Sequence, residues 1–134
     1  MTAEELTAYV RAGVPLAGAL GVEVLSAGDG AATVRLPPSA LSLRPGGTAS
    51  GPSLMALADV ALWAALLGSN GGRDDARTTD LAVAFLRPAG AAGVLAEARW
   101  VRRGRRALYG EVWMRGAGAE EPCAHATSAW LSVV

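Results

Sequence analysis

The chain has 134 residues, of which 51% are hydrophobic, and its formal net charge is zero. A hydrophobic content this high excludes a disordered chain, and the balanced charge argues against a nucleic-acid binder that works through a basic surface. No apolar run reaches the roughly 18 residues of a membrane span, and the N-terminus lacks the basic segment and apolar core of a secretion signal. The one cysteine excludes an internal disulfide and offers no metal-ligand spacing. We therefore expect a single cytoplasmic domain over residues 1–134, without a nucleic-acid or membrane partner.

The first third of the chain predicts two short helices and a hairpin. Residues 2–11 fit a helix that begins at a capping box formed by Thr2 and Glu5. Residues 14–20 fit a further helical turn before a glycine. Apolar residues then alternate over 22–36 on both sides of an Asp-Gly turn, which is typical of a β-hairpin.

The middle of the chain predicts one long helix behind a loop rich in glycine and proline. Ser50 or Gly51 would cap this helix, which we expect over about residues 52–67, with Gly68 ending it. Its residues are apolar on every side, and a helix that is hydrophobic all round is typically buried at the centre of a fold. We therefore expect the rest of the chain to pack around this helix.

Asp59 is the one charged residue in that helix. A buried carboxylate costs on the order of several kcal/mol unless it is partnered, hydrated or protonated. Either the fold supplies a partner for Asp59, or the carboxylate takes part in chemistry. Perturbed acids mark active sites but also structural ion pairs, so the residues alone leave both readings open.

The C-terminal half predicts strands. Residues 79–86 alternate with the two-residue period of a half-buried strand, and residues 94–101 and 107–114 flank an arginine-rich hairpin turn. Residues 123–134 form the last expected strand. Several antiparallel strands after one buried helix favour an α+β fold in which a curved sheet wraps around the helix.

Three motifs follow one another along the chain. The first is the tripeptide Ser50-Gly51-Pro52, with Asp59 seven residues beyond it. The second is Phe85-Leu86-Arg87-Pro88-Ala89, followed by Gly93, and the third is Gly104-Arg105 in the next hairpin turn. In this order and spacing they resemble the hotdog-fold acyl-CoA thioesterases, in particular the group related to the phenylacetate-pathway thioesterase. The resemblance covers nearly the whole chain.

The resemblance implies a hotdog fold and an enzyme that hydrolyses an acyl-CoA thioester to free coenzyme A and a carboxylic acid. Coenzyme A is then part of the substrate, and no metal or redox cofactor is needed. It also implies Asp59 as general base or nucleophile and the backbone N–H of Gly51 as oxyanion donor. The loop histidine and asparagine that help to hold the thioester carbonyl in relatives are Ser50 and Arg44 here. Ser50 adds a hydroxyl to the site or, as we favour, caps the helix.

Relatives build each site at a dimer interface, so the resemblance implies a homodimer or a homotetramer. In relatives a Ser or Thr at the start of the strand after the helix helps to hold the attacking water across that interface. We expect Thr78 in this role, opposite the partner's Asp59, with Thr79 as a neighbouring substrate-binding residue. The alternative for both is the plain β-propensity of threonine.

Arginines are candidates for binding the phosphates of coenzyme A, because phosphates favour bidentate, permanently charged donors. A solvated hairpin tip is the alternative for any single one of them. Arg103 and Arg105 are the main candidates. Arg44, in the loop before the helix, is a further substrate-binding candidate, at the position of the family's asparagine. We expect a cluster of five arginines at or near one hairpin: Arg87, Arg102, Arg103, Arg105 and Arg106.

Two other functions stay open. A hotdog hydratase or dehydratase relies on a histidine paired with an acid. This reading is disfavoured, because the one histidine, His125, is distant from Asp59 in the sequence and is expected to pack on a strand. A non-catalytic acyl-CoA-binding protein, acting as a sensor or scaffold, is favoured by the loss of the loop histidine. The tryptophans are expected to fill the core and a subunit interface: Trp63, Trp100, Trp113 and Trp130.

Overall fold

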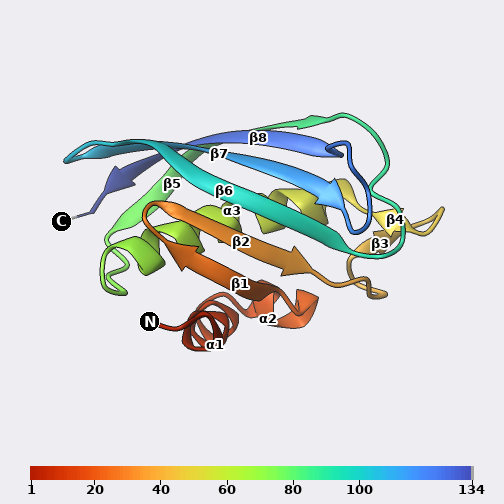
Figure 1. Ribbon diagram of the computed structural model, residues 1–134, viewed down its shortest axis with the longest axis horizontal. Helices are drawn as coiled ribbons and strands as arrows, with labels where there is room; N and C mark the ends of the chain where they lie inside the picture. Colours follow the sequence, from red (N-terminus) through yellow and green to blue (C-terminus); the bar gives the residue numbers. More distant parts are fainter. Residues whose placement is uncertain (134) are drawn as a thin grey trace.

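The computed structural model describes residues 1–133 as an α+β fold in which a curved antiparallel sheet wraps around one long helix (Figure 1). The helices are α1 (Ala3–Gly13), α2 (Pro15–Leu20) and α3 (Gly51–Ser69). The large sheet contains β1 (Glu23–Gly28), β2 (Ala31–Leu36), β5 (Ala76–Phe85), β6 (Val94–Arg103), β7 (Ala107–Gly116) and β8 (Ala124–Ser132). A short ribbon of β3 (Leu43–Arg44) and β4 (Thr48–Ala49) precedes α3. The predicted fold class and central helix are confirmed.

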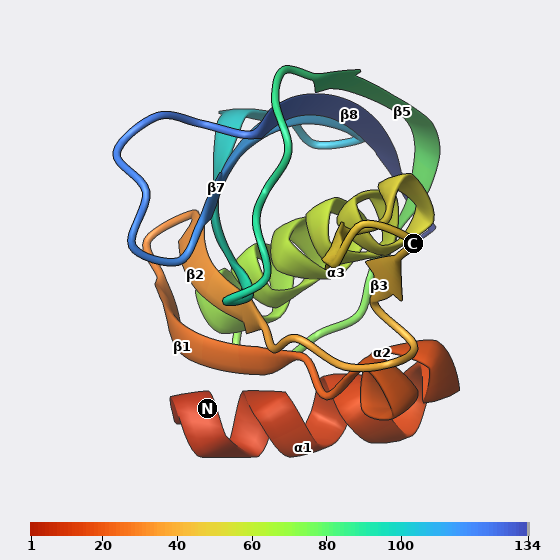
Figure 2. The same cartoon turned by 90° about the vertical axis from the view of Figure 1, so that its right-hand side faces the viewer.

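The strand order of the large sheet is β1-β2-β6-β7-β8-β5. All neighbouring strands are antiparallel. Although β5 follows α3 directly in the sequence, it lies at the sheet edge opposite β1. Figure 2 shows the sheet arching over α3, with α1 and α2 on the side of β1.

The N-terminal elements form as predicted, because local signals specify them. Thr2 and Glu5 make the two reciprocal capping-box bonds at the start of α1. The β1–β2 hairpin turns at Asp29 and Gly30, whose φ angles are 53° and 78°. A tight two-residue turn that matches the twist of its strands needs positive φ at both central residues.

The long helix α3 is buried because its side chains are apolar on every face. Residues such as Leu57, Ala61 and Leu62 are 0% exposed. By length and composition α3 would also suit a membrane span, but 67% of its apolar window is buried inside the fold. This burial is typical of a core helix.

The expectation about the end of α3 was wrong. Gly68 lies inside the helix, which continues to Ser69 and has Asn70 as its C-cap. A Cβ at Gly68 would lie 2.7 Å from the Cβ of Ala27, so glycine here lets α3 approach β1 closely. The loop rich in glycine and proline before α3 holds the β3–β4 ribbon, whose two-residue strands are too short for an alternating pattern.

The edge strand β5 starts earlier than the predicted range of 79–86 and carries a β-bulge. Its register with β8 shifts between Thr78 and Asp80, so that Thr79 is the extra residue. Because strand side chains alternate, an extra residue changes which of them face α3. The side chains on the α3 side are Ala76 and Thr78 before the bulge and Leu81, Val83 and Phe85 after it.

The aromatic side chains divide between the core and the convex face of the sheet. Trp63, Trp100 and Trp130 are at most 9% exposed, as expected for core residues, whereas Trp113 is 46% exposed. His125 packs against Trp113 with ring centroids 4.0 Å apart, which confirms the expectation of a packed histidine. The last strand forms as predicted up to Ser132. Its expected final residue, Val134, lies outside the described residues.

Candidate functional site

Asp59 lies in the middle of α3, and Thr78 lies opposite it on β5. The Oγ1 of Thr78 donates a hydrogen bond to Oδ1 of Asp59 over 2.6 Å. The bulge at Thr79 makes this contact possible, because it turns Thr78 toward α3 while Leu81 and Val83 still pack against the core. The expectation that Thr78 meets the partner's Asp59 is therefore wrong, since the two residues pair within one chain.

The Asp59 carboxylate is partly buried and has no cation beside it. Burial raises the pKa of Asp59 above the ordinary value of an aspartate, and the hydrogen bond from Thr78 opposes this increase. None of the ion pairs within residues 1–133 includes Asp59. A structural ion pair therefore does not account for this acid within the protomer. A perturbed carboxyl group in a cavity wall is instead typical of a functional site.

A cavity of about 290 Å³ adjoins Asp59 and Thr78. Three aromatic side chains from three elements line it: Tyr9 of α1, Trp63 of α3 and Trp130 of β8. Trp63 follows Asp59 by one helical turn, so the indole lies roughly 6 Å farther along α3 than the carboxylate. The arrangement places an acid beside largely apolar walls, which suits the binding of an apolar group next to the carboxylate.

The N-terminus of α3 offers one free backbone donor. Ser50 is the N-cap, and its Oγ accepts from the Ser53 N–H at 3.3 Å and donates to the Ser53 Oγ at 2.8 Å. The capping role favoured for Ser50 is thus confirmed. Pro52 has no N–H, and no group within residues 1–133 accepts from the N–H of Gly51. Gly51 therefore carries the free donor of the first turn, where the helix dipole favours negative charge.

Gly51 and Asp59 do not share one site within a protomer. They are eight residues apart on α3, which corresponds to about 12 Å at 1.5 Å per residue. The residue beside Gly51 is instead Phe85, whose Cζ lies 3.6 Å from the position of a Cβ at Gly51. The protomer thus holds two separate half-sites: the Asp59–Thr78 pair in the middle of α3 and the Gly51 N–H at its start.

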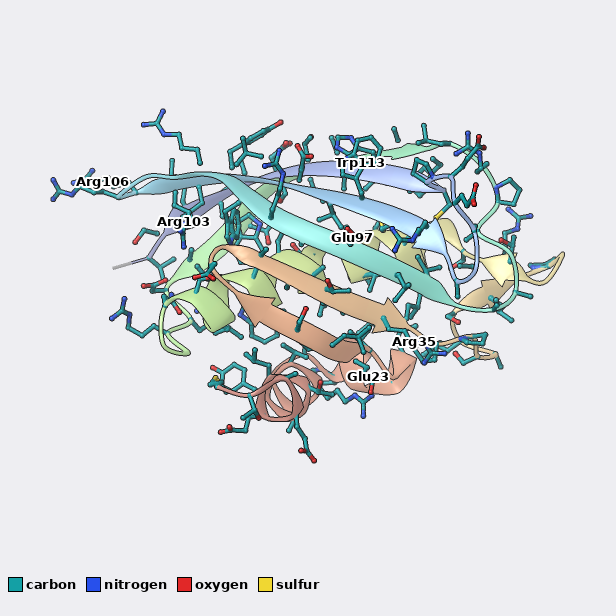
Figure 3. All side chains as sticks on the ribbon, viewed as in Figure 1. Glu23, Arg35, Glu97, Arg103, Arg106 and Trp113 are labelled. Atoms are coloured by element: carbon teal, nitrogen blue, oxygen red, sulfur yellow. The ribbon has the colours of Figure 1, made fainter. Side chains whose placement is uncertain are left out.

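The arginines do not form the single cluster that we expected. Those of the β6–β7 turn lie at one end of the sheet, where Figure 3 labels Arg103 and Arg106. Arg87 lies beyond the end of β5, where its Nε is 3.3 Å from Oε2 of Glu121. The ten residues of β7 connect these two ends of the sheet, a distance of about 30 Å. Within residues 1–133, none of the arginines at positions 102–106 forms an ion pair with an acid.

The remaining candidates stand apart from Asp59. Arg44 is exposed on the β3–β4 ribbon, and its Nε donates to the carbonyl oxygen of Pro45 at 3.1 Å. Thr79 is the bulged residue, and its hydroxyl donates to the carbonyl oxygen of Ala129 at 3.0 Å. In the part of the chain that the structure describes, no group of three or more His, Cys, Asp or Glu side chains is arranged to hold a metal ion.

Two features of the site were missed from the sequence. The bulge leaves a pattern in the sequence, because the residues that face α3 change from even positions, Ala76 and Thr78, to odd positions from Leu81 onward. The contribution of α1 to the cavity leaves no such pattern in the sequence. Tyr9 reaches Trp63 across the molecule, and no local pattern records a contact between residues 54 positions apart.

The fold and the site together define a class of protein: a hotdog domain with a carboxyl group of raised pKa in the middle of its central helix. The family model that describes the Thioesterase superfamily matches residues 46–123, which is more than half of the sequence. The chain belongs to this superfamily. No curated protein matches the sequence.

Solved structures are consistent with this family. A putative thioesterase from Silicibacter sp. TM1040 is 32% identical, with 100% of this chain and 93% of that chain covered and a TM-score of 0.88. A variant of the phenylacetic acid degradation protein PaaI from Thermus thermophilus is 32% identical over 87% of this chain and 97% of that chain, with a TM-score of 0.75. Zebrafish thioesterase superfamily member 2 shares the fold, with 20% identity, 98% of both chains covered and a TM-score of 0.85.

Proposed function

We propose that the protein hydrolyses acyl-CoA thioesters to coenzyme A and a carboxylic acid, with Asp59 as the reacting carboxylate. The observation that carries this proposal is the Asp59–Thr78 pair, in which an acid of raised pKa and without a cation adjoins an aromatic-lined cavity. Membership of the Thioesterase superfamily supports the class of reaction.

Two routes use this geometry. In the first, the carboxylate accepts a proton from a water molecule while the water oxygen attacks the thioester carbonyl carbon. In the second, a carboxylate oxygen attacks that carbon directly, and water then hydrolyses the mixed anhydride. In both routes the C–S bond breaks and coenzyme A leaves as the thiol after taking up a proton. Because Thr78 holds Oδ1 of Asp59, Oδ2 is the oxygen available for either role.

The oxyanion donor would come from a second subunit. If β5 pairs with its own copy about a twofold axis, the two strands run antiparallel and the start of each lies opposite the end of the other. The end of β5, at Phe85, lies beside Gly51 in the same chain, while the start of β5 carries Thr78. Such pairing therefore brings the partner's Gly51 N–H toward Asp59 and joins the two half-sites.

The exposed edge of β5 supports this dimer. It is a ten-residue strand at the end of the sheet, and a long unpaired apolar edge is a liability that proteins usually cover. Phe85, the first residue of the second family motif, is 54% exposed in the protomer, and Leu86 is 48% exposed. A partner strand would cover this apolar surface and satisfy the free backbone groups. A tetramer would need a further interface, for which the exposed Trp113 on the convex face is a candidate.

The β6–β7 turn would hold the phosphates of coenzyme A. Gly30 shows that the turn lies at the C-terminal end of α3. The N–H of Gly30 donates to Oγ of Ser69, the last residue of α3, and the guanidinium carbon of Arg103 lies 3.3 Å from the position that a Cβ on Gly30 would occupy. From Asp59 to that end of α3 is about 15 Å. The pantetheine arm has a similar length of about 15 Å when extended, because three chain bonds span about 3.6 Å. Arg103 and Arg105 would then contact the phosphates.

The experiment that tests the proposal replaces Asp59 by Asn and measures thiol release from acyl-CoA. Asp59→Asn keeps the shape of the side chain and removes the base, so kcat should fall by about 10²-fold or more. Asp80→Asn is the matched control, since Asp80 is an exposed acid on the same strand as Thr78. The melting temperature of Asp59→Asn should be unchanged or higher, because a buried charge is removed.

Wild-type turnover by Asp59→Asn would exclude the proposed role of the carboxylate. Tight binding of acyl-CoA by the wild-type protein without any thiol release would favour the non-catalytic acyl-CoA-binding alternative.

A further inference from the structure

Two aromatic rings line the cavity beside the Asp59 carboxylate. The ring centroids of Tyr9, on α1, and Trp63, on α3, are 5.8 Å apart, and the ring planes are tilted by 58°. Both side chains line the cavity. Since Trp63 follows Asp59 by one helical turn, an acyl group that enters the cavity beside the carboxylate meets this aromatic pair.

Trp63 is held in place from two sides. Its Nε1 donates to Oδ1 of Asp74 at 3.0 Å, and the same oxygen accepts from Nη1 of Arg77 at 3.0 Å. At the tip of the indole, a Cβ at Gly13 would lie 2.9 Å from Cη2 of Trp63. Glycine at position 13 therefore allows α1 to press against the ring. The aromatic wall is fixed before any ligand binds.

The cavity is small for a ligand site. Its volume of about 290 Å³ lies just below the range of roughly 300–1,000 Å³ that is usual for small-molecule pockets. At roughly 30 Å³ for a water-sized group, it holds about ten such groups. This space accommodates one aromatic ring with a short linker, or a short alkyl chain, and has too little room for all the carbons of a dodecanoyl chain.

We infer that Tyr9 and Trp63 restrict the acyl group to compact ones, a single ring or a short chain, and that Tyr9 is the main specificity-determining residue. The inference rests on the proposed function, because it names the acyl class for the same site. The N-terminal helix that carries Tyr9 lies outside residues 46–123, which match the superfamily. Of the two rings, Trp63 therefore lies inside the matched segment and Tyr9 outside it.

The test compares kcat/KM for benzoyl-CoA, butyryl-CoA and dodecanoyl-CoA. The wild-type protein should prefer the two compact substrates. Tyr9→Ala opens the wall and should raise the ratio of dodecanoyl-CoA to benzoyl-CoA activity by about tenfold or more, the effect typical of pocket walls that reject extra methylene groups. Gly13→Ala pushes on Trp63 and should reduce activity on benzoyl-CoA more than on butyryl-CoA.

Tyr109→Ala is the matched control, because Tyr109 is 43% exposed, close to the 39% of Tyr9, and lies on β7 away from the cavity. It should leave the substrate ratio unchanged. Tyr9→Leu, which keeps an apolar contact with Trp63 and shortens the wall, should shift the ratio in the same direction as Tyr9→Ala. An unchanged ratio in both Tyr9 variants overturns the inference and leaves the proposed hydrolysis standing.

A second readout separates the inference from the proposed function. The same three acyl-CoA compounds are titrated against Asp59→Asn, with and without Tyr9→Ala, and binding is followed by quenching of tryptophan fluorescence. Tighter binding of the compact acyl groups that disappears in the double variant supports the size limit, even if the wild-type protein hydrolyses none of them. Equal binding of all three by Asp59→Asn overturns it.

Discussion

The hydroxyl of Thr78 influences the charge of Asp59 as well as its position. Burial favours the neutral acid and raises the pKa, whereas the hydrogen bond from Thr78 favours the carboxylate and lowers it. A general base or nucleophile acts as the carboxylate, so activity should increase as the pH rises through the pKa of Asp59. The position of that increase on the pH scale therefore reports the balance between the two effects.

Replacing Thr78 by Val removes the bond to Asp59 and leaves burial as the main influence on its pKa. The pKa of Asp59 should then be higher, and the acidic limb of the profile of kcat/KM against pH should move to higher pH. Thr79→Val is the control, because the Thr79 hydroxyl is bonded to the carbonyl of Ala129 and not to Asp59. The same acidic limb in wild-type protein and Thr78→Val would show that Asp59 does not govern it.

At the scale of elements, the β6–β7 hairpin extends past the end of α3 and carries arginines that lack acidic partners within residues 1–133. Replacing Arg103 and Arg105 together by Ala should raise KM for acyl-CoA by about tenfold or more, the effect of losing at least about 1.4 kcal/mol of binding. The same variant should hydrolyse thioesters of truncated pantetheine normally, because these have no phosphates.

The comparison with a second double variant makes this prediction specific. Arg99 of β6 pairs with Glu111 of β7, and Arg115 of β7 pairs with Glu97 of β6. Replacing Arg99 and Arg115 by Ala changes the net charge by the same amount as replacing Arg103 and Arg105. It should leave KM for acyl-CoA close to that of the wild-type protein. Equal losses on acyl-CoA and on the truncated thioester would indicate that the turn does not contact phosphate.

How far the sequence predicts this structure depends on the range of the interactions. The capping box at Thr2 and the Asp29-Gly30 turn are local, and both were predicted. Gly68 was misread, because its glycine serves a contact with Ala27 on another element and not the end of the helix. Arg87 and Arg103 are close in sequence, but β6 runs the length of the sheet between them and places them at opposite ends.

The candidate site follows the same rule. Asp59 was found from a single charge in an apolar helix, and Thr78 from the resemblance to the hotdog thioesterases. Their pairing within one chain was not predicted, since it depends on the register between β5 and β8 and on the bulge at Thr79. The acyl cavity needs Tyr9 from α1, which the chain brings to Trp63 only when the whole fold has formed.

At the scale of the whole molecule, we expect the protein to be at least a dimer, paired through β5. Ala82 is exposed near the middle of that strand, so two copies of it would lie close to the proposed twofold axis. Ala82→Asp would place like charges across the interface, which destabilises strand pairing. The variant should be monomeric by light scattering at micromolar concentration and should lose most of its thioesterase activity.

The control for this variant is Ala31→Asp, which adds the same charge at an exposed position on β2, away from the β5 edge. It should stay dimeric and active. A wild-type protein that is fully active as a monomer would contradict both the dimer and the joining of half-sites by a partner.

The bulge in β5 also has an evolutionary consequence. Loss of Thr79 by a one-residue deletion would restore regular alternation along the strand, and one side of the bulge would have to rotate to the opposite face. Either Thr78 would turn away from Asp59, or the apolar side chains from Leu81 onward would turn out of the core. No single substitution repairs both defects. Descendants of this chain can therefore vary the residues of β5 much more freely than its length.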